Sequence, residues 1–116
     1  MRKQYEIHER IFQFVVRGLK VPRFLPKTIE SKIIIDQYVR ALTSVGANDN
    51  EADGVSSKKD FIHVYTIVRK ELKETYYWLR IIESTNTQLE SRLAALLKES
   101  DELIRIISTI ITNASR

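Results

Sequence analysis

The sequence predicts an all-α protein folded as an antiparallel up-down-up-down four-helix bundle. Three observations predict this fold. Apolar residues recur at helical spacing in four segments, no segment alternates apolar and polar residues for long enough to form a sheet, and the connections between the four segments are short. A chain of 116 residues suits one hydrophobic core, so we expect residues 1–116 to form a single four-helix-bundle domain.

The first helix is predicted over about residues 5–20. Its apolar residues recur at helical spacing, with two further apolar side chains beside them: Ile7, Ile11, Phe14 and Val15, then Phe12 and Leu19. Both prolines of the chain follow directly in the segment VPRFLPK. Because proline cannot continue a helix, this segment marks the first turn of the chain.

The second helix is predicted over about residues 29–53, with Thr28 as its N-cap. Its apolar stripe advances in steps of four and three through Ile34, Tyr38, Ala41, Val45, Asn48 and Ala52. This stripe crosses SVGANDNEAD, residues 44–53, whose composition is otherwise typical of a loop. Because a loop would interrupt the stripe, we predict that these residues are helical and that Gly54 ends the helix in a left-handed conformation. Gly46 then costs the helix about 1 kcal/mol relative to alanine. This indicates either that a neighbouring helix packs closely against Gly46 or that the fold tolerates the loss of stability.

The third and fourth helices each begin at a predicted N-cap. Ser57 precedes a helix over about residues 58–84, whose stripe is Phe61, Tyr65, Val68, Leu72, Thr75, Leu79 and Ile82. Thr87 and Glu90 form a capping box at the start of a helix over about residues 87–113, whose stripe is Leu89, Leu93, Leu96, Ser100, Leu103, Ile107 and Ile110.

The fourth helix has more apolar residues than one stripe requires, and the first helix is similarly broad. The additional side chains of the fourth helix are Leu97, Ile104, Ile106 and Ile111. They have two interpretations, a wide core or a second interface that buries them through self-association. The pattern alone leaves both open.

The composition limits the chemistry of the chain. Without cysteine there is neither a disulfide nor a thiolate metal site. The N-terminal residues lack the hydrophobic region of a signal peptide, and no stretch approaches the roughly 18 apolar residues of a membrane span. We therefore expect a soluble, cytoplasmic protein without a membrane partner.

No set of residues matches a known type of catalytic site. His8 and His63 have no metal-ligating partner at helical spacing, and Glu71 and Glu74 lack the histidines that accompany such glutamates in di-iron bundles. A nucleophilic triad and a glycine-rich phosphate loop are also lacking. We expect a protein that is not an enzyme, with no catalytic residues, no metal and no cofactor.

Positive charge is concentrated near the N-terminus. The chain carries a net charge of +4, whereas residues 1–27 hold seven Lys or Arg against two Glu. Such a segment attracts phosphates, so the candidate nucleic-acid-binding residues are Arg10, Arg17, Lys20, Arg23 and Lys27. The alternative is a purely structural or protein-binding oligomer in which these charges are solvated.

Asn48 is the unusual residue of the second helix, because it occupies the predicted apolar stripe between Val45 and Ala52. A buried amide must find partners, so we expect hydrogen bonds to a side chain of the third helix or to backbone one turn away. The residue either fixes the register of the bundle or lines a ligand pocket.

Two blocks of the sequence resemble a known family. The run SVGANDNEADGVSSKKDFIH, followed by IVRKELKETYYWLR, is similar to the four-helix-bundle proteins encoded in intervening sequences of bacterial 23S ribosomal RNA genes. The matching positions are Ser44, Gly46, Ala47, Asn48, Glu51, Ala52, Asp60, Phe61, Lys70, Glu71, Glu74, Trp78, Leu79 and Arg80. The chain departs from the family at Asp49, where many members have an aromatic residue, and at Val68 and Leu72, where many have alanine.

The resemblance implies an antiparallel four-helix bundle that associates as a homopentamer. It also implies a structural rather than catalytic role for the motif residues Gly46, Asn48, Glu51, Glu71, Glu74, Trp78 and Arg80. A related protein, the accessory variability determinant of diversity-generating retroelements, is a basic bundle that binds nucleic acid and a reverse transcriptase. The resemblance therefore suggests a nucleic-acid or ribonucleoprotein scaffold, with RNA, DNA or a reverse-transcriptase-like protein as the partner.

Overall fold

The computed structural model describes the backbone of residues 2–116 and the side chains of residues 6–116. Four α-helices follow one another along the chain: α1 (Arg2–Gly18), α2 (Ile29–Ala52), α3 (Lys58–Thr85) and α4 (Glu90–Ala114). Short 3-10 turns lie at Val21–Phe24 and Thr87–Leu89. Residues 2–116 contain no strand, and the predicted all-α four-helix bundle is confirmed.

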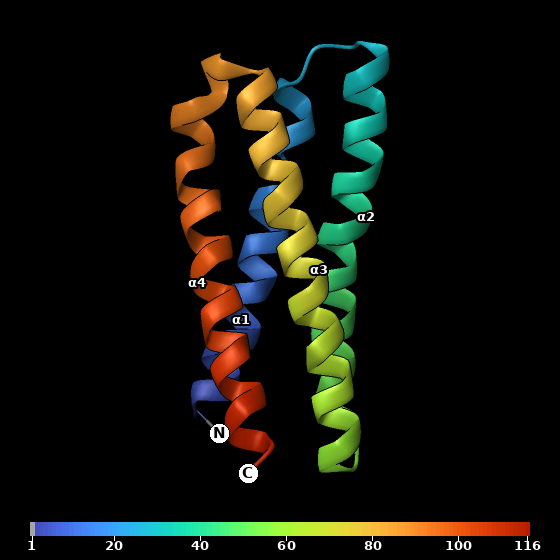
Figure 1. Cartoon of the computed structure of the whole chain (residues 1–116), viewed down its shortest axis with the longest axis vertical. Helices are drawn as coiled ribbons and strands as arrows, with labels where there is room; N and C mark the ends of the chain where they lie inside the picture. Colours follow the sequence, from blue (N-terminus) through green and yellow to red (C-terminus); the bar gives the residue numbers. More distant parts are fainter. Residues whose placement is uncertain (1) are drawn as a thin grey trace.

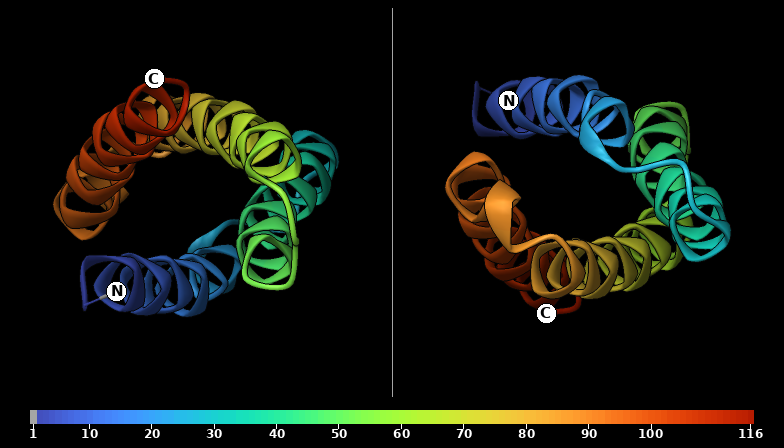
Figure 2. Two further views of the ribbon diagram at one scale, coloured as in Figure 1. Left: turned by 90° about the horizontal axis from the view of Figure 1, so that it is seen from below. Right: turned by 90° about the horizontal axis from the view of Figure 1, so that it is seen from above.

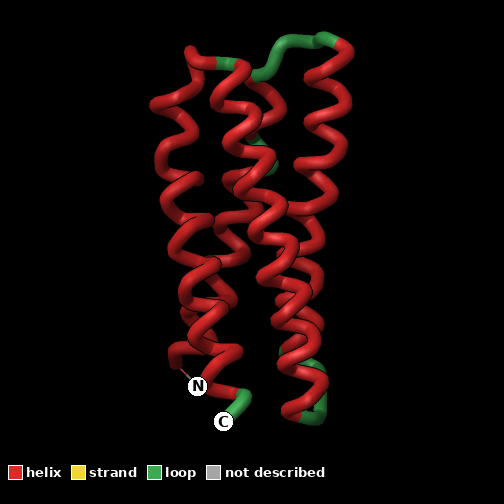
Figure 3. The backbone as a smooth tube through the Cα atoms, viewed as in Figure 1, coloured by secondary structure: helices red, strands yellow, loops and turns green. Residues whose placement is uncertain are grey.

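Consecutive helices run in opposite directions along a bundle 45 Å long (Figure 1). Viewed along its axis, α1, α2, α3 and α4 follow one another around the bundle, so α1 and α4 are also neighbours (Figure 2). The loops lie at the two ends (Figure 3). The up-down-up-down order brings four helix ends to one end of the bundle: the ends of α1 and α3 and the starts of α2 and α4.

The core consists of one apolar stripe from each helix. In α3, the six predicted stripe residues from Tyr65 to Ile82 are buried, and Phe61 is half-buried. Along α4 and the turn before it, the predicted residues from Leu89 to Ile107 are buried, but Ile111 replaces Ile110 at the end of the stripe. Over residues 6–18 of α1, the buried apolar side chains are Ile7, Ile11 and Phe14. The step-of-three-and-four pattern therefore located most of the core.

Two of the three predicted N-caps are confirmed. The side-chain oxygens of Thr28 and Ser57 accept hydrogen bonds from the backbone N–H groups of Ser31 at 3.1 Å and Asp60 at 3.0 Å. Thr87 was predicted wrongly as a cap, because it lies in a 3-10 turn and α4 begins at Glu90 without a side-chain cap. The buried Asn86 side chain instead closes α3 by donating to the Ile82 carbonyl at 3.0 Å. The 3-10 turn has a backbone hydrogen bond of its own, in which Leu89 N–H donates to the Asn86 carbonyl at 2.8 Å.

The SVGANDNEAD segment is helical as predicted, since α2 continues to Ala52. The expected left-handed conformation of Gly54 is wrong, because no glycine in the described chain has a positive φ. A tight right-handed turn ends the helix instead: the N–H groups of Asp53 and Gly54 donate to the carbonyls of Asn50 and Glu51 at 3.3 and 3.0 Å. These bonds satisfy carbonyls at the helix end, so a left-handed residue is not required.

Two glycines allow α1 and α2 to approach closely. A Cβ atom added to Gly46 would lie 3.3 Å from Val15, and one added to Gly18 would lie 2.7 Å from Leu42 Cδ2 and 2.8 Å from the Tyr38 hydroxyl. The buried Tyr38 hydroxyl donates to the Gly18 carbonyl at 2.8 Å. Of the two interpretations of Gly46, the structure supports close packing.

We predict that Gly18→Ala lowers the free energy of unfolding by about 1–3 kcal/mol, because the new methyl group overlaps Leu42 and the Tyr38 hydroxyl. Urea unfolding measures the change. Gly54→Ala is the matched control, since a Cβ there meets only the Glu51 carbonyl at an ordinary 3.6 Å. Equal stability of the Gly18 variant and the wild type would contradict close packing at this position.

Candidate nucleic-acid interface

The buried polar residue of α2 is Asp49 rather than Asn48. Asp49 is 5% exposed, whereas Asn48 is half-buried and donates from its amide to the Ser44 carbonyl at 2.9 Å and to the Ser44 hydroxyl at 3.1 Å. The predicted bond to backbone one turn away is therefore present, but the predicted burial in the stripe is wrong. The stripe advances from Val45 by four residues rather than three, so its next member is Asp49.

The Asp49 carboxylate joins three helices. It accepts hydrogen bonds from the Tyr65 hydroxyl of α3 at 2.7 Å and from Nδ1 of His8 on α1 at 2.9 Å. Nε2 of the same histidine lies 3.5 Å from the exposed carboxylate of Asp53. Burial, and then the charge of Asp49, raise the pKa of the Tyr65 phenol far above its ordinary value, so the phenol remains a donor to the carboxylate.

The sequence analysis missed this cluster because its members are far apart along the chain. His8 and Asp49 are 41 positions apart, and Tyr65 follows Asp49 by 16. Helical spacing relates residues of one helix only, so it could not connect His8 of α1 with Asp49 of α2 or Tyr65 of α3. The replacement of an aromatic residue by Asp49 was the one local signal.

The motif residues of α2 and α3 differ in exposure. Glu51, Glu74 and Arg80 are exposed, and Glu71 and Trp78 are half-buried. Burial and the neighbouring Glu74 raise the pKa of Glu71, and Lys70 opposes them. The Trp78 indole lies 5.0 Å from the Tyr77 ring, and its buried N–H has no hydrogen-bond partner among the described residues.

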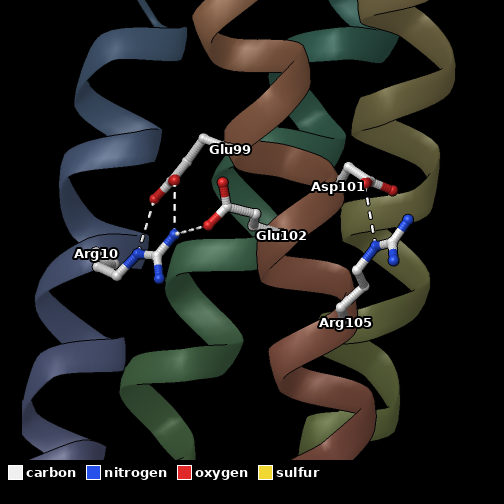
Figure 4. A network of polar contacts seen from close by, with 5 residues as sticks. All are labelled: Arg10, Glu99, Asp101, Glu102 and Arg105. Atoms are coloured by element: carbon white, nitrogen blue, oxygen red, sulfur yellow. Dashed lines mark hydrogen bonds and ion pairs between the residues drawn. The ribbon is translucent and has the colours of Figure 1, made fainter.

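Arg10 binds carboxylates of α4. Its guanidinium donates from Nε and Nη2 to Glu99 at 3.0 and 2.7 Å and from Nη2 to Glu102 at 3.3 Å (Figure 4). Hydrogen bonding to Glu99 is the main cause that raises the pKa of Arg10. This candidate phosphate ligand therefore connects α1 to α4, 89 positions away, and its charge is already compensated.

The other four candidates surround the turn between α1 and α2. Arg17, Lys20, Arg23 and Lys27 are exposed, and none of them forms an ion pair with another described residue. Arg17 and Lys20 line a hollow of about 200 Å³ with Phe24 and Arg92, the latter from α4. Arg23 and Lys27 line a second hollow of about 540 Å³ with Lys32 of α2.

We call these six residues the basic end of the bundle: Arg17, Lys20, Arg23, Lys27, Lys32 and Arg92. It lies where α1 ends and α2 and α4 begin, at the top of Figure 1. Lys32 and Arg92 are not among the residues predicted from the sequence, because they lie outside the N-terminal segment in which positive charge is concentrated. Only the antiparallel packing of α4 brings Arg92 beside residues 17–24.

Exposed apolar side chains lie on α1 and at the start of α2. Phe12, Val16 and Leu19 follow one face of α1, and Ile29 and Ile33 lie one turn apart on α2 with exposed fractions of 80% and 60%. The surplus predicted on α4 is not exposed, since Leu97, Ile104, Ile106 and Ile110 pack against the core and Ile111 belongs to it. This packing favours the wide-core interpretation for α4.

Two features concern metals and membranes. Among the described residues, no three His, Asp or Glu side chains lie close enough together to hold a metal ion. The helices over residues 2–116 contain no segment that is both long and apolar enough to cross a membrane.

We predict that Asp49→Ala lowers the free energy of unfolding by about 1–3 kcal/mol, because it leaves the buried Tyr65 hydroxyl without its acceptor. Asn48→Ala is the control and should cost less, since the amide bonds only within its own helix turn and is half-buried. Chemical unfolding of both variants tests the assignment. A larger loss for Asn48→Ala than for Asp49→Ala would contradict it.

Comparison with known proteins agrees with the fold. A crystal structure of a protein of unknown function from the S23 ribosomal protein family of Bacteroides thetaiotaomicron has a TM-score of 0.81 and 30% sequence identity. The match covers 95% of this chain and 98% of that one. No protein with a curated functional description matches the chain. The model of the family described as 23S rRNA-intervening sequence protein matches residues 3–109, and the chain therefore belongs to this family.

Proposed function

We propose that this protein is a non-enzymatic helical bundle that binds the phosphates of nucleic acid, as part of a ribonucleoprotein or similar assembly. The observation that carries the proposal is the basic end, where six cationic side chains from α1, α2, α4 and the first turn gather without compensating ion pairs among the described residues. Phosphate contacts by Lys and Arg provide most of the affinity of nonspecific nucleic-acid binding.

The local electrostatics support an anionic partner. α2 and α4 begin at this end while α1 and α3 end there, so the partial charges of the four helix termini largely offset one another and the charged side chains determine the local potential. Three carboxylates lie in the terminal helix turns at this end: Glu30 of α2, Glu83 of α3 and Glu90 of α4. Six cations against these three carboxylates leave an excess of positive charge, and the family description, which refers to 23S rRNA, is consistent with an RNA context.

We further propose that the protein acts as a homo-oligomer, with a pentamer favoured by the family resemblance. Exposed Phe12 and Val16 on α1, Leu19 directly after it, and Ile29 and Ile33 on α2 support an interface, because several large apolar side chains left exposed are often covered by a partner. A closed ring would repeat the basic end in each subunit. Repetition raises the avidity of individually weak phosphate contacts by orders of magnitude.

We predict that reversing three charges of the basic end abolishes binding to a fluorescein-labelled RNA or DNA oligonucleotide at about 50 mM salt. The variant is Arg17→Glu, Lys20→Glu, Arg23→Glu, and fluorescence anisotropy measures the dissociation constant. For the wild type, log K should fall with log salt with a slope of about −0.7 to −0.9 per phosphate contact, hence about −3 for four contacts.

The matched control is Lys59→Glu, Lys73→Glu, Lys98→Glu, which changes the net charge equally through exposed residues of α3 and α4. It should retain most of the affinity of the wild type. Equal losses in both triple variants would indicate attraction by net charge alone. Absence of wild-type binding to any nucleic acid at this salt concentration would refute the proposed function.

The second candidate function is a purely structural or protein-binding oligomer, with a reverse-transcriptase-like protein among the partners that the resemblance suggests. The observation that favours it is the exposed apolar surface of α1 and α2, which requires no nucleic acid. In this case the charges of the basic end are solvated and serve solubility.

Self-association is tested by light scattering. We predict that the wild type has an oligomeric mass at micromolar concentration and that Val16→Glu, Leu19→Glu reduces it, because charges placed in an apolar interface cannot be desolvated without a partner. Lys73→Glu on the exposed face of α3 is the control and should leave the mass unchanged. A monomeric wild type would refute the interface.

A further inference from the structure

Phe24 is a solvent-exposed aromatic side chain among the cations of the basic end. It ends the 3-10 turn Val21–Phe24, and 45% of it is exposed. On either side along the chain, Val21 and Leu25 are buried in the core. These two anchors, together with Pro22 within the turn, fix the backbone so that Phe24 points away from the core. The ring is thus presented at the surface by a backbone that is anchored on both sides.

Arg92 approaches Phe24 from α4. Its guanidinium carbon lies 4.3 Å from the ring centroid, within the range of a cation–π contact. Arg92 forms no ion pair with a described carboxylate, so the guanidinium keeps its donors available. The two side chains form a stacked pair that carries both an aromatic face and a free cation.

The hollow beside this pair suits one flat group next to phosphates. Its volume is about 200 Å³, below the roughly 300–1,000 Å³ of pockets that enclose drug-sized ligands. Its lining combines the apolar Val21, Leu89, Leu93 and Leu96 with Phe24 and the cations Arg17, Lys20 and Arg92. An apolar floor with cations around it complements a nucleobase that is attached to a negatively charged backbone.

We infer that the basic end recognises unpaired nucleotides of single-stranded nucleic acid, with a base stacked against the Phe24–Arg92 pair and the adjoining phosphates bound by Arg17 and Lys20. This inference rests on the proposed function and specifies its ligand. Sequence-tolerant binding of single strands combines a positive groove with aromatic stacking, because every base has a π face. The bases of a duplex are stacked on each other and cannot reach a side chain at the surface.

The test compares a labelled 15-nucleotide single-stranded RNA, the single-stranded DNA of the same sequence and the RNA duplex, by fluorescence anisotropy at one salt concentration. The wild type should bind both single strands more tightly than the duplex. Phe24→Ala should weaken single-strand binding by about fivefold to a hundredfold, the usual effect of losing one base stack, and leave duplex binding unchanged. Phe24→Trp should retain single-strand binding. A difference between the RNA and DNA strands shows whether the 2′-hydroxyl contributes.

Tyr77→Ala is the matched control, because Tyr77 is exposed to a similar extent but lies on α3 and does not line the hollow. It should leave all affinities unchanged, and circular dichroism of each variant confirms folding. The inference is overturned if Phe24→Ala has no effect, or if it weakens single-strand and duplex binding equally. In both cases the loss of binding in the charge-reversal variant would still support the proposed function. Absence of wild-type binding to all three probes refutes both.

Discussion

The attachment of α1 to the rest of the bundle is the constraint on which both functional surfaces depend. α1 carries the exposed apolar face, and its end begins the basic end. Apolar packing of Ile7, Ile11 and Phe14 provides the contact, and polar interactions determine where along the other helices it forms. One of these is the buried Asp49 carboxylate, which holds α1 through His8 and α3 through Tyr65.

Three polar contacts distribute this attachment along α1. His8 binds Asp49 of α2, Arg10 binds Glu99 of α4, and the Gly18 carbonyl accepts from Tyr38 of α2. A carboxylate or phenol in the interior is costly unless it is paired, so sliding α1 by one turn would leave buried polar groups without partners. Polar residues of this kind favour one register over alternatives that an apolar stripe would tolerate. Register is one of the two roles considered for Asn48, and in this structure Asp49 is positioned to fulfil it.

The basic end is a consequence of this fixed register and of antiparallel topology. Residues 17–27 lie in the connection after α1, while Arg92 lies in the first turn of a helix that starts more than sixty positions later. The two regions meet only because α4 begins at the end where α1 finishes. Phe24 is exposed there because its neighbours Val21 and Leu25 occupy the core and anchor the turn. The fold thereby places an aromatic ring among cations without requiring either to be buried.

The sequence by itself determined the number of helices, their approximate bounds, most of the core and the region of excess positive charge. These properties follow from the periodicity and composition of single segments, and the caps at Thr28 and Ser57 are equally local. Tertiary structure alone distinguished Asp49 from Asn48. Adjacent residues of a helix differ by about 100° in direction, and a stripe of mixed three- and four-residue steps fits either position. It also decided that Arg10 pairs with Glu99, that Arg92 joins the basic end and that the extra apolar residues of α4 pack against the core. Each of these depends on contacts between helices far apart in the chain.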